Sequence, residues 1–443
     1  MFDNVCSLPL SSDLFAQAVH PTEPIVAVGL LTGHVAALRL PAADDNGDAS
    51  VLSAATTESG TGTIETIWRT RRHQESCRSL GFSVDGRTLF SAGADGVVKA
   101  AETETGVVRS KIVLPAEKNS PIDAATVLHV LSPQTLLIGT DSSALHLYDL
   151  RIPSAPAGNS TTWFRSSKPQ QTHRPHAPSH ISSITPFPPS DTSTSGYSKQ
   201  WLSTGGGTVA VTDLRRGVLA QSDDVGEELM CSAYVPHSGR KGRGDQILVG
   251  SGEGEVMIWE RGHWDSWGER INLGGGNETV ETFAVLPAGC GGVKGSVAAI
   301  GMGMSDDGWG RVKLVDIKAR RVVGELLHEV KEDVTAIGYD VAGRLITGGG
   351  CVLKVWHEKG EGEEEDEEED EEGEQEEDQE ATVSANGHSK RAPESEDEED
   401  SDDDSDSSMD MPSRNKPSPT KKPKRKGNLP NGGVAELAFD GLD

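Results

Sequence analysis

A short pattern that recurs through the first 357 residues constrains the fold more than any other feature of this chain. Each copy has a turn of small residues, an alternating apolar strand and a terminal pair whose second member is usually acidic. The seven copies lie at 32–38, 94–102, 142–149, 205–213, 250–260, 310–316 and 348–357. A unit of this size cannot bury its apolar face alone, so the copies must pack against one another.

Radial packing of four-stranded sheets closes such units into a ring and leaves few strand edges exposed. The terminal pairs are spaced by roughly 40–65 residues, and the shortest spacing fits a four-stranded propeller blade. The longer spacings require inserted loops, for which the chain has Pro-, Ser- or Gly-rich segments at 154–179, 188–198 and 289–295. The sequence therefore predicts an all-β, seven-bladed β-propeller over residues 1–357.

The strand order inside a unit follows from the alternation. The second unit is expected to have strands at 77–82, 88–92 and 97–101, the last two joined by an Asp95-Gly96 turn. The last unit has three expected strands, at 334–338, 345–347 and 352–356. Residues 4–9 precede the first inner strand, so we expect them to supply the missing fourth strand and to close the ring.

The units resemble the WD40 repeat, in which a His, a Ser or Thr, a turn Asp and a Trp form a hydrogen-bonded set inside each blade. The second unit offers His73, Ser91 and Asp95 for this set, but Ala101 stands where the Trp belongs. The expected Trp occurs only at Trp259 and Trp356, so the set is complete in no unit.

A more specific resemblance rests on residues 68–79, together with 10–21, 24–34 and 92–99. These segments resemble the nucleolar WD-repeat-55-type family, which includes the fungal Jip5 proteins. The resemblance implies a nucleolar scaffold in ribosome biogenesis, chiefly large-subunit assembly and rRNA processing. Its implied partners are ribosome-assembly proteins, with pre-rRNA contacted indirectly, and it implies no catalytic site.

The net charge of −29 is concentrated at the end of the chain. Residues 361–410 hold 27 acidic and 2 basic side chains, and residues 361–443 as a whole carry −21, which leaves −8 for the first 360. An acidic tract of this composition cannot repay the entropy of ordering, so residues 358–427 are expected to be disordered, followed by a short tail at 428–443. The acidic tract either solubilises the protein or binds basic partners such as ribosomal proteins or histones.

A basic string follows the acidic tract and matches what an importin recognises. It predicts nuclear import through Lys421, Lys422, Lys424, Arg425 and Lys426, and the family resemblance implies localisation to the nucleolus. Acidophilic phosphorylation is a weaker expectation, based on an acidic residue three positions after each of Ser395, Ser401 and Ser407.

No motif in the chain nominates a nucleophile, a general base or a phosphate-binding loop. The five cysteines lie far apart without a Cys-x-x-Cys pair, which indicates buried, reduced thiols. His173, His176 and His180 lie in a Pro-rich segment without cysteine partners, so a metal site there is not favoured. We expect a binding protein that is not an enzyme, has no cofactor or metal, does not enter a membrane and acts as a monomer within a larger complex.

Three surfaces are candidates for partner binding. The first is a basic rim near the central channel, on the loop that enters the second inner strand, where guanidinium groups could hold phosphate or an acidic peptide. Its residues are Arg69, Arg71, Arg72, His73 and Arg78. The alternative for these residues is internal pairing, with Glu75 or with the acidic tract.

The second surface belongs to another class of function. The sequences Asp149-Leu-Arg151 and Asp213-Leu-Arg215 resemble the blade ending with which substrate receptors of cullin-4 ubiquitin ligases contact their adaptor. That function requires Arg151 and Arg215 to lie on one face. Trp264 and Trp267 are a third candidate, or else they pack beneath a loop between blades.

Overall fold

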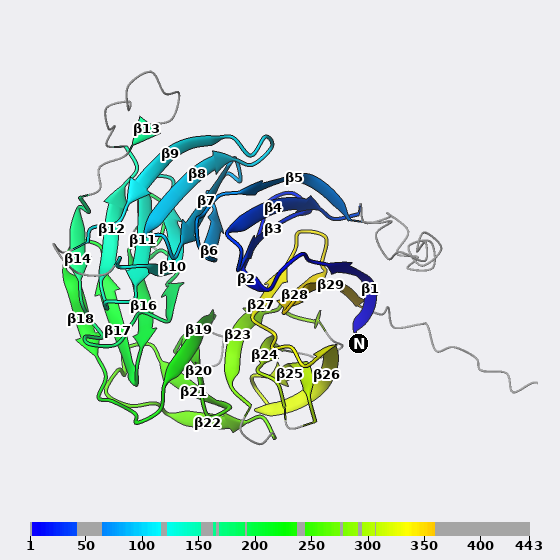
Figure 1. The fold of residues 1–443 in the computed structure, drawn as a ribbon. Coiled ribbons are helices and arrows are strands. Elements are labelled where there is room, and N and C mark those ends of the chain that lie inside the picture. The colour runs from blue at the N-terminus through cyan, green and yellow to red at the C-terminus, as the bar shows by residue number, and fades with distance from the viewer. Residues whose placement is uncertain are drawn as a thin grey trace, which may run out of the picture. The chain divides into compact units, whose positions relative to one another are not determined.

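Alternating apolar side chains build strands through most of the described part of the first 358 residues. The computed structural model describes residues 2–41, 64–116, 122–151, 163–164, 168–190, 193–236, 244–274, 278–290, 295–305 and 307–358. They form seven antiparallel blades arranged in a ring (Figure 1). The predicted all-β, seven-bladed β-propeller is therefore confirmed.

Each blade runs outward from an inner strand. Blade 1 consists of β2 (Leu14–Val19), β3 (Ile25–Leu30), β4 (His34–Arg39) and β5 (Glu65–Arg71). Blade 2 consists of β6 (Cys77–Phe82), β7 (Thr88–Gly93), β8 (Val97–Glu102) and β9 (Val108–Val113), with β13 (Trp163–Phe164) added in parallel to β9. Blade 3 consists of β10 (Ala125–Ser132), β11 (Thr135–Thr140), β12 (Leu145–Asp149) and β14 (Gln171–His173).

The remaining blades follow the same order. Blade 4 consists of β15 (Ser183–Pro186), β16 (Gln200–Gly205), β17 (Thr208–Asp213) and β18 (Gly217–Gln221). Blade 5 consists of β19 (Leu229–Val235), β20 (Gln246–Ser251), β21 (Glu255–Glu260) and β22 (Glu269–Asn272). Blade 6 consists of β23 (Val280–Val285), β24 (Val297–Met302), β25 (Trp309–Asp316) and β26 (Arg321–Val330).

Blade 7 joins the two ends of the propeller. Its strands are β27 (Ala336–Tyr339), β28 (Leu345–Gly349), β29 (Val352–Glu358) and β1 (Phe2–Pro9). β1 pairs antiparallel with β29, so the N-terminal strand completes the last blade as predicted. Phe2 and Cys6 are buried by this pairing, which adds packing to the hydrogen bonds of closure.

The core lies between neighbouring blades as well as inside them. One cluster joins Leu14, Val28 and Leu38 of blade 1 to Ile346 and Val355 of blade 7. Packing of this kind removes apolar area from water on both faces of a blade, which contributes about 25 cal/mol per Å². Each blade thus depends on its neighbours, as the repeat pattern requires.

The polar set expected in blade 2 is present without its Trp. His73 is buried, with Nδ1 at 3.0 Å from Asp95 Oδ1 and Nε2 at 3.0 Å from Ser91 Oγ. The carboxylate of Asp95 also accepts the backbone N–H of Gln74, at 3.1 Å. These bonds tie the loop that enters the blade to its β7–β8 hairpin.

Two further histidines form similar hydrogen bonds to hydroxyl side chains, although the sequence did not indicate them for this role. His176 lies 2.9 Å from Ser203 Oγ and 2.7 Å from Thr208 Oγ1 in blade 4. His328 belongs to β26 of blade 6 and forms a buried network with two residues of blade 7. Thr347 Oγ1 lies 3.0 Å from His328 Nδ1 and accepts the indole N–H of Trp356 at 2.8 Å.

Neighbouring histidines in the Pro-rich segment have separate partners. Nε2 of His173 lies 3.2 Å from Gln171 Oε1, whereas Nε2 of His180 lies 4.0 Å from Glu228. Over the described ranges, no three His, Cys, Asp or Glu side chains come close enough to hold a metal ion. The five cysteines are free thiols, four of them buried. No helix in the described part of the chain is long and apolar enough to cross a membrane.

Candidate protein-binding surfaces

The blades present two rims, because successive strands alternate in direction. Loops between blades, and loops between the second and third strands of a blade, lie on one rim, called here the interblade rim. The remaining hairpin loops lie on the opposite rim. Rims carry the loop side chains of a propeller, whereas the strands hold the scaffold rigid.

The five residues of the expected basic rim do not form one surface. Arg69 and Arg71 belong to β5, the outermost strand of blade 1, so they lie away from the central channel. Both are exposed: Arg69 donates to Ser11 Oγ, and Arg71 donates to the carbonyl of Gln74 at 3.1 Å. The pKa of neighbouring His34 is lowered by burial and by these two guanidinium groups. The outer edge of blade 1 is therefore a small basic surface.

Arg72 and His73 are not available to a partner, which corrects the expectation for these two residues. The guanidinium of Arg72 is buried, lies 4.5 Å above the ring of Trp68 and donates to the carbonyl of Gly106 at 2.7 Å. Burial lowers the pKa of Arg72 to about 10. Trp68 donates to the carbonyl of Thr103 at 2.6 Å, so the pair clamps blade 1 to blade 2.

Arg78 also joins blades. Its Nη1 donates to both carboxylate oxygens of Asp141, at 3.0 and 2.8 Å, and so links blade 2 to the β11–β12 loop of blade 3. Arg78 is therefore paired within the chain, as the alternative to partner binding predicted. Its partner is Asp141 and not Glu75.

The two Asp-Leu-Arg sequences come together in space. Arg151 and Arg215 line one cavity of about 760 Å³ between blades 3 and 4, on the opposite rim. Arg151 is paired with Asp149 at 2.6 Å, whereas the exposed Arg215 donates its backbone N–H to Asp213 at 2.9 Å. Burial would raise the pKa of Asp213, but hydrogen bonds from this N–H and from Gln200 hold it below its usual value.

Trp264 and Trp267 pack against the propeller. Trp264 stacks on Phe187 at 5.9 Å between ring centroids, and Trp267 meets Trp259 edge-on at 6.4 Å. Both contact the apolar cluster shared by blades 4 and 5. The two tryptophans therefore pack on the propeller, as the alternative to a binding role predicted, but they lie in the β21–β22 connection within blade 5 and not beneath a loop between blades.

Blade 6 carries an exposed apolar edge that the sequence analysis missed. Met304, Leu327 and Val330 are 48%, 50% and 42% exposed. Leu327 follows buried Leu326 in β26, and since successive strand residues face opposite sides, one of the two had to point outward. That adjacency is the signal that could have revealed this edge.

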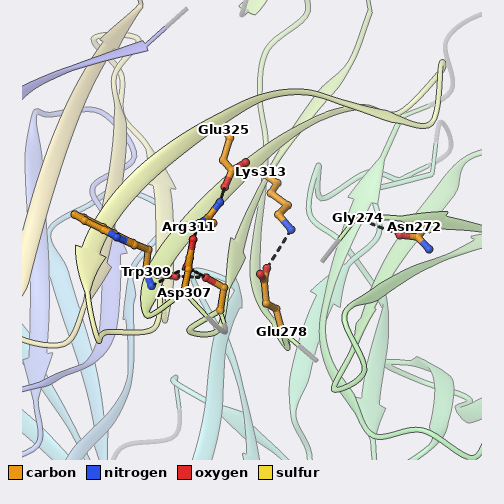
Figure 2. Close-up of polar contacts among 9 residues, drawn as sticks. Asn272, Gly274, Glu278, Asp307, Trp309, Arg311, Lys313 and Glu325 are labelled. Carbon is orange, nitrogen blue, oxygen red and sulfur yellow. Dashed lines mark hydrogen bonds and ion pairs between the residues drawn. The ribbon is translucent and has the colours of Figure 1, made fainter. Parts of the chain in front are cut away.

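Charged side chains flank this edge. Figure 2 shows Arg311 between Asp307 and Glu325, with which it forms two ion pairs. Deeper in the blade, Lys313 donates to Glu278 at 3.0 Å, and both side chains are almost fully buried. These cations neutralise acidic neighbours, so they are not offered to a partner.

The basic string predicted to bind an importin and the phosphorylation candidates lie outside the described residues, as do the acidic tract and the residues after it. The rest of the chain defines the class: a WD-repeat β-propeller, a generally non-catalytic scaffold that binds other proteins. Residues 65–100 match the WD40 family described as "WD domain, G-beta repeat". This match runs from β5 to β8, so the sequence repeat is offset from the structural blade.

Comparisons over most of the chain identify the family within the class of WD-repeat β-propellers. The chain is 54% identical over 363 residues to "WD repeat-containing protein jip5" of Aspergillus niger, covering 81% of this chain and 82% of that protein. Identity to the protein of the same name from Aspergillus clavatus is 55%, over 81% and 84% of the two chains. For the protein from Phaeosphaeria nodorum it is 49%, over 81% and 83%. The chain belongs to the Jip5 family of WD-repeat proteins.

Proposed function

We propose that the chain is a non-enzymatic nucleolar scaffold that acts in ribosome biogenesis, in large-subunit assembly and rRNA processing, by binding ribosome-assembly proteins. Its identity to Jip5 proteins over 81% of its length carries this proposal, because the family resemblance implies that role. The basic string at 421–426 supports delivery to the nucleus by an importin.

The charge distribution favours protein contacts over direct binding of RNA. Affinity for RNA depends on cations that are free to neutralise phosphates, yet the first 360 residues carry −8. Most arginines with described partners pair with carboxylates of this chain, as do Arg78, Arg109, Arg151, Arg261, Arg270, Arg311, Arg320 and Arg344. Pre-rRNA would then be reached through a bound protein.

Co-purification tests this function. The full-length tagged chain is isolated from its own cells at moderate salt, with and without ribonuclease, and the recovered proteins are identified. Recovery of large-subunit precursor proteins that survives ribonuclease is the expected result. Their absence would overturn the proposed function, and their loss on ribonuclease treatment would replace protein contact with RNA contact.

A substrate receptor of a cullin-4 ubiquitin ligase is the second candidate. The observation that favours it is the shared cavity of Arg151 and Arg215, which satisfies the requirement that both lie on one face. The test compares adaptor recovery by an Arg151→Ala/Arg215→Ala double variant with that by Arg216→Ala, an exposed neighbour. Loss in the double variant alone supports the receptor, whereas no adaptor on the unaltered chain excludes it.

A further inference from the structure

A cavity of about 860 Å³ lies between blades 2 and 3 on the interblade rim. Its lining residues come from the described ends of the β9–β10 connection, from the β11–β12 loop, and from β12, β14 and the two residues at 168–169 that precede β14. Ligand sites in proteins have volumes of roughly 300–1,000 Å³, so the cavity is large enough for a short peptide segment.

The charged groups around this cavity are already engaged. Arg78 holds both oxygens of Asp141 from outside the cavity. Asp123 accepts the N–H and the hydroxyl of Ser142, at 2.9 and 2.6 Å, and Arg174 donates to the Ser142 carbonyl at 2.6 Å. Lys168, the other lining cation, also has an interaction partner. Two carboxylates and two cations balance, so the cavity does not select a charged ligand.

An apolar wall faces these groups. It consists of Pro115, Ala116, Ile122 and Pro169. Ile122 is 58% exposed, the largest exposed fraction among the large apolar side chains described. Because proline has little conformational freedom, a proline-rich wall loses little conformational entropy on binding and can hold one apolar side chain of a ligand.

The cavity contains one polar group without a partner. His146 is 4% exposed; its Nδ1 lies 2.8 Å from Thr172 Oγ1, and its Nε2 has no hydrogen-bond partner among the described residues. Burial lowers the pKa of His146, so the ring is neutral and its Nε2 either donates or accepts, depending on the tautomer. A buried polar group without a partner gains when a ligand supplies one.

We propose that this cavity binds a short extended segment of a partner protein, with one neutral apolar side chain against Ile122 and one peptide group hydrogen-bonded to Nε2 of His146. A peptide group offers both an N–H and a C=O beside an apolar side chain, so it satisfies either tautomer. A charged ligand would gain no net attraction, because the two carboxylates and two cations that line the cavity balance. The assignment rests on the proposed protein-binding function and gives it a site and a partner chemistry.

Selection from random linear peptides displayed on phage, with the full-length chain as bait, tests the site. Selected peptides are compared on the unaltered chain, on Ile122→Glu and on Val341→Glu, a control that is 53% exposed on the opposite rim of blade 7. Peptides with an apolar anchor should bind Ile122→Glu at least about tenfold more weakly and bind Val341→Glu unchanged. Their affinity should be insensitive to salt, because the cavity carries no net charge.

A spectroscopic readout locates the contact. The ¹⁵N resonance of His146 Nε2 should shift when a selected peptide is added, which a purely structural imidazole would not show. The site is overturned if peptides bind Ile122→Glu as tightly as the unaltered chain, if the resonance stays in place, or if only basic, salt-sensitive peptides are selected.

The outcome is separable from that of co-purification. If peptide binding is unaffected by Ile122→Glu but large-subunit precursors are recovered, the cavity is not the peptide site and the proposed scaffold function is retained. If the peptides bind Ile122→Glu more weakly and shift the His146 resonance, but no precursors are recovered, the proposed scaffold function is wrong and the assignment of the cavity as a peptide site is retained.

Discussion

Arg344 is one of the largest fully buried side chains of the protein, and it joins the last blade to the first. Its Nε and Nη2 donate to Asp340 Oδ2 at 2.9 and 2.6 Å, while Nη1 donates to the carbonyl of Pro41 at 2.8 Å. Replacing Arg344 with Met should lower the free energy of unfolding by about 3–5 kcal/mol, because Asp340 is left buried without a counter-charge. Urea denaturation of purified variants measures this loss.

Arg109→Met is the matched control, since Arg109 pairs with Glu102 at the surface. Exposed pairs contribute little, so this variant should unfold at almost the same urea concentration as the unaltered chain. Equal shifts for the two variants would show that the buried pair has no special part in closing the ring.

The structural histidines make stability depend on pH. Burial lowers the pKa of both His176 and His328 to about 4, from an ordinary value of 6.5. Between pH 6.5 and 4 the unfolded chain therefore binds more protons than the folded chain, so stability falls as the pH is lowered through that window. The loss should reach a few kcal/mol for each residue at most.

Thermal melting over this pH range checks the assignment. His176→Gln removes one of the two titrating groups and should reduce the pH dependence, while His263→Gln, at an exposed side chain, is the control for a His-to-Gln change elsewhere. A slope as steep in His176→Gln as in the unaltered chain would contradict the role given to His176.

At the scale of elements, β1 is the strand whose removal should cost most. It pairs with β29 along its length, buries Phe2 and Cys6, and leaves β29 as an open edge when absent. Deleting residues 2–9 should lower the melting temperature and promote aggregation, because an unpaired edge strand recruits other chains. Differential scanning calorimetry and light scattering measure the two effects.

Rescue in trans provides the control. A synthetic peptide with the sequence of residues 2–9 should restore part of the stability, and a scrambled peptide of equal composition should not. A deletion variant that melts at the original temperature would show that the ring does not need this strand.

The inner strands were predictable from the sequence, whereas outermost strands other than β1 were not. In blade 2 the expected strands at 77–82, 88–92 and 97–101 match β6, β7 and β8 to within a residue. The sequence predicts a loop where β5 lies, because an outer strand packs on one side only and its Trp-Arg-Thr-Arg ending shows no apolar alternation. β14 was missed for a similar reason, since its three residues lie within a Pro-rich segment.

The candidate surfaces were partly predictable. That Arg151 and Arg215 face one cavity follows from equivalent positions in adjacent repeats, so the repeat pattern contained that information. The burial of Arg72 depends on a contact between blades, with the carbonyl of Gly106, and the cavity at His146 is lined by residues from two blades, such as Ile122 and Pro169. Spacing along the chain does not encode such contacts.

At the scale of the whole molecule, the two parts of the proposed function, partner binding and nuclear import, are assigned to segments of different charge. The first 360 residues carry only −8, residues 361–410 carry −25, and residues 411–427 carry seven cations without an acid. A partner-binding propeller needs no strong field, whereas recognition by an importin depends on a dense cationic string. Import should therefore be removable without disturbing the propeller.

Replacing the five cations of the basic string with Ala should shift the chain from the nucleus to the cytoplasm while its melting temperature stays unchanged. The changes are Lys421→Ala, Lys422→Ala, Lys424→Ala, Arg425→Ala and Lys426→Ala. Fluorescence imaging of a tagged chain measures the distribution, and Arg414→Ala/Lys416→Ala is the control with nearby charges removed. An unrelated import signal fused to the variant should restore both nuclear entry and recovery of large-subunit precursors. Nuclear accumulation of the five-residue variant without that signal would mean that the chain enters the nucleus by another route, such as with a bound partner.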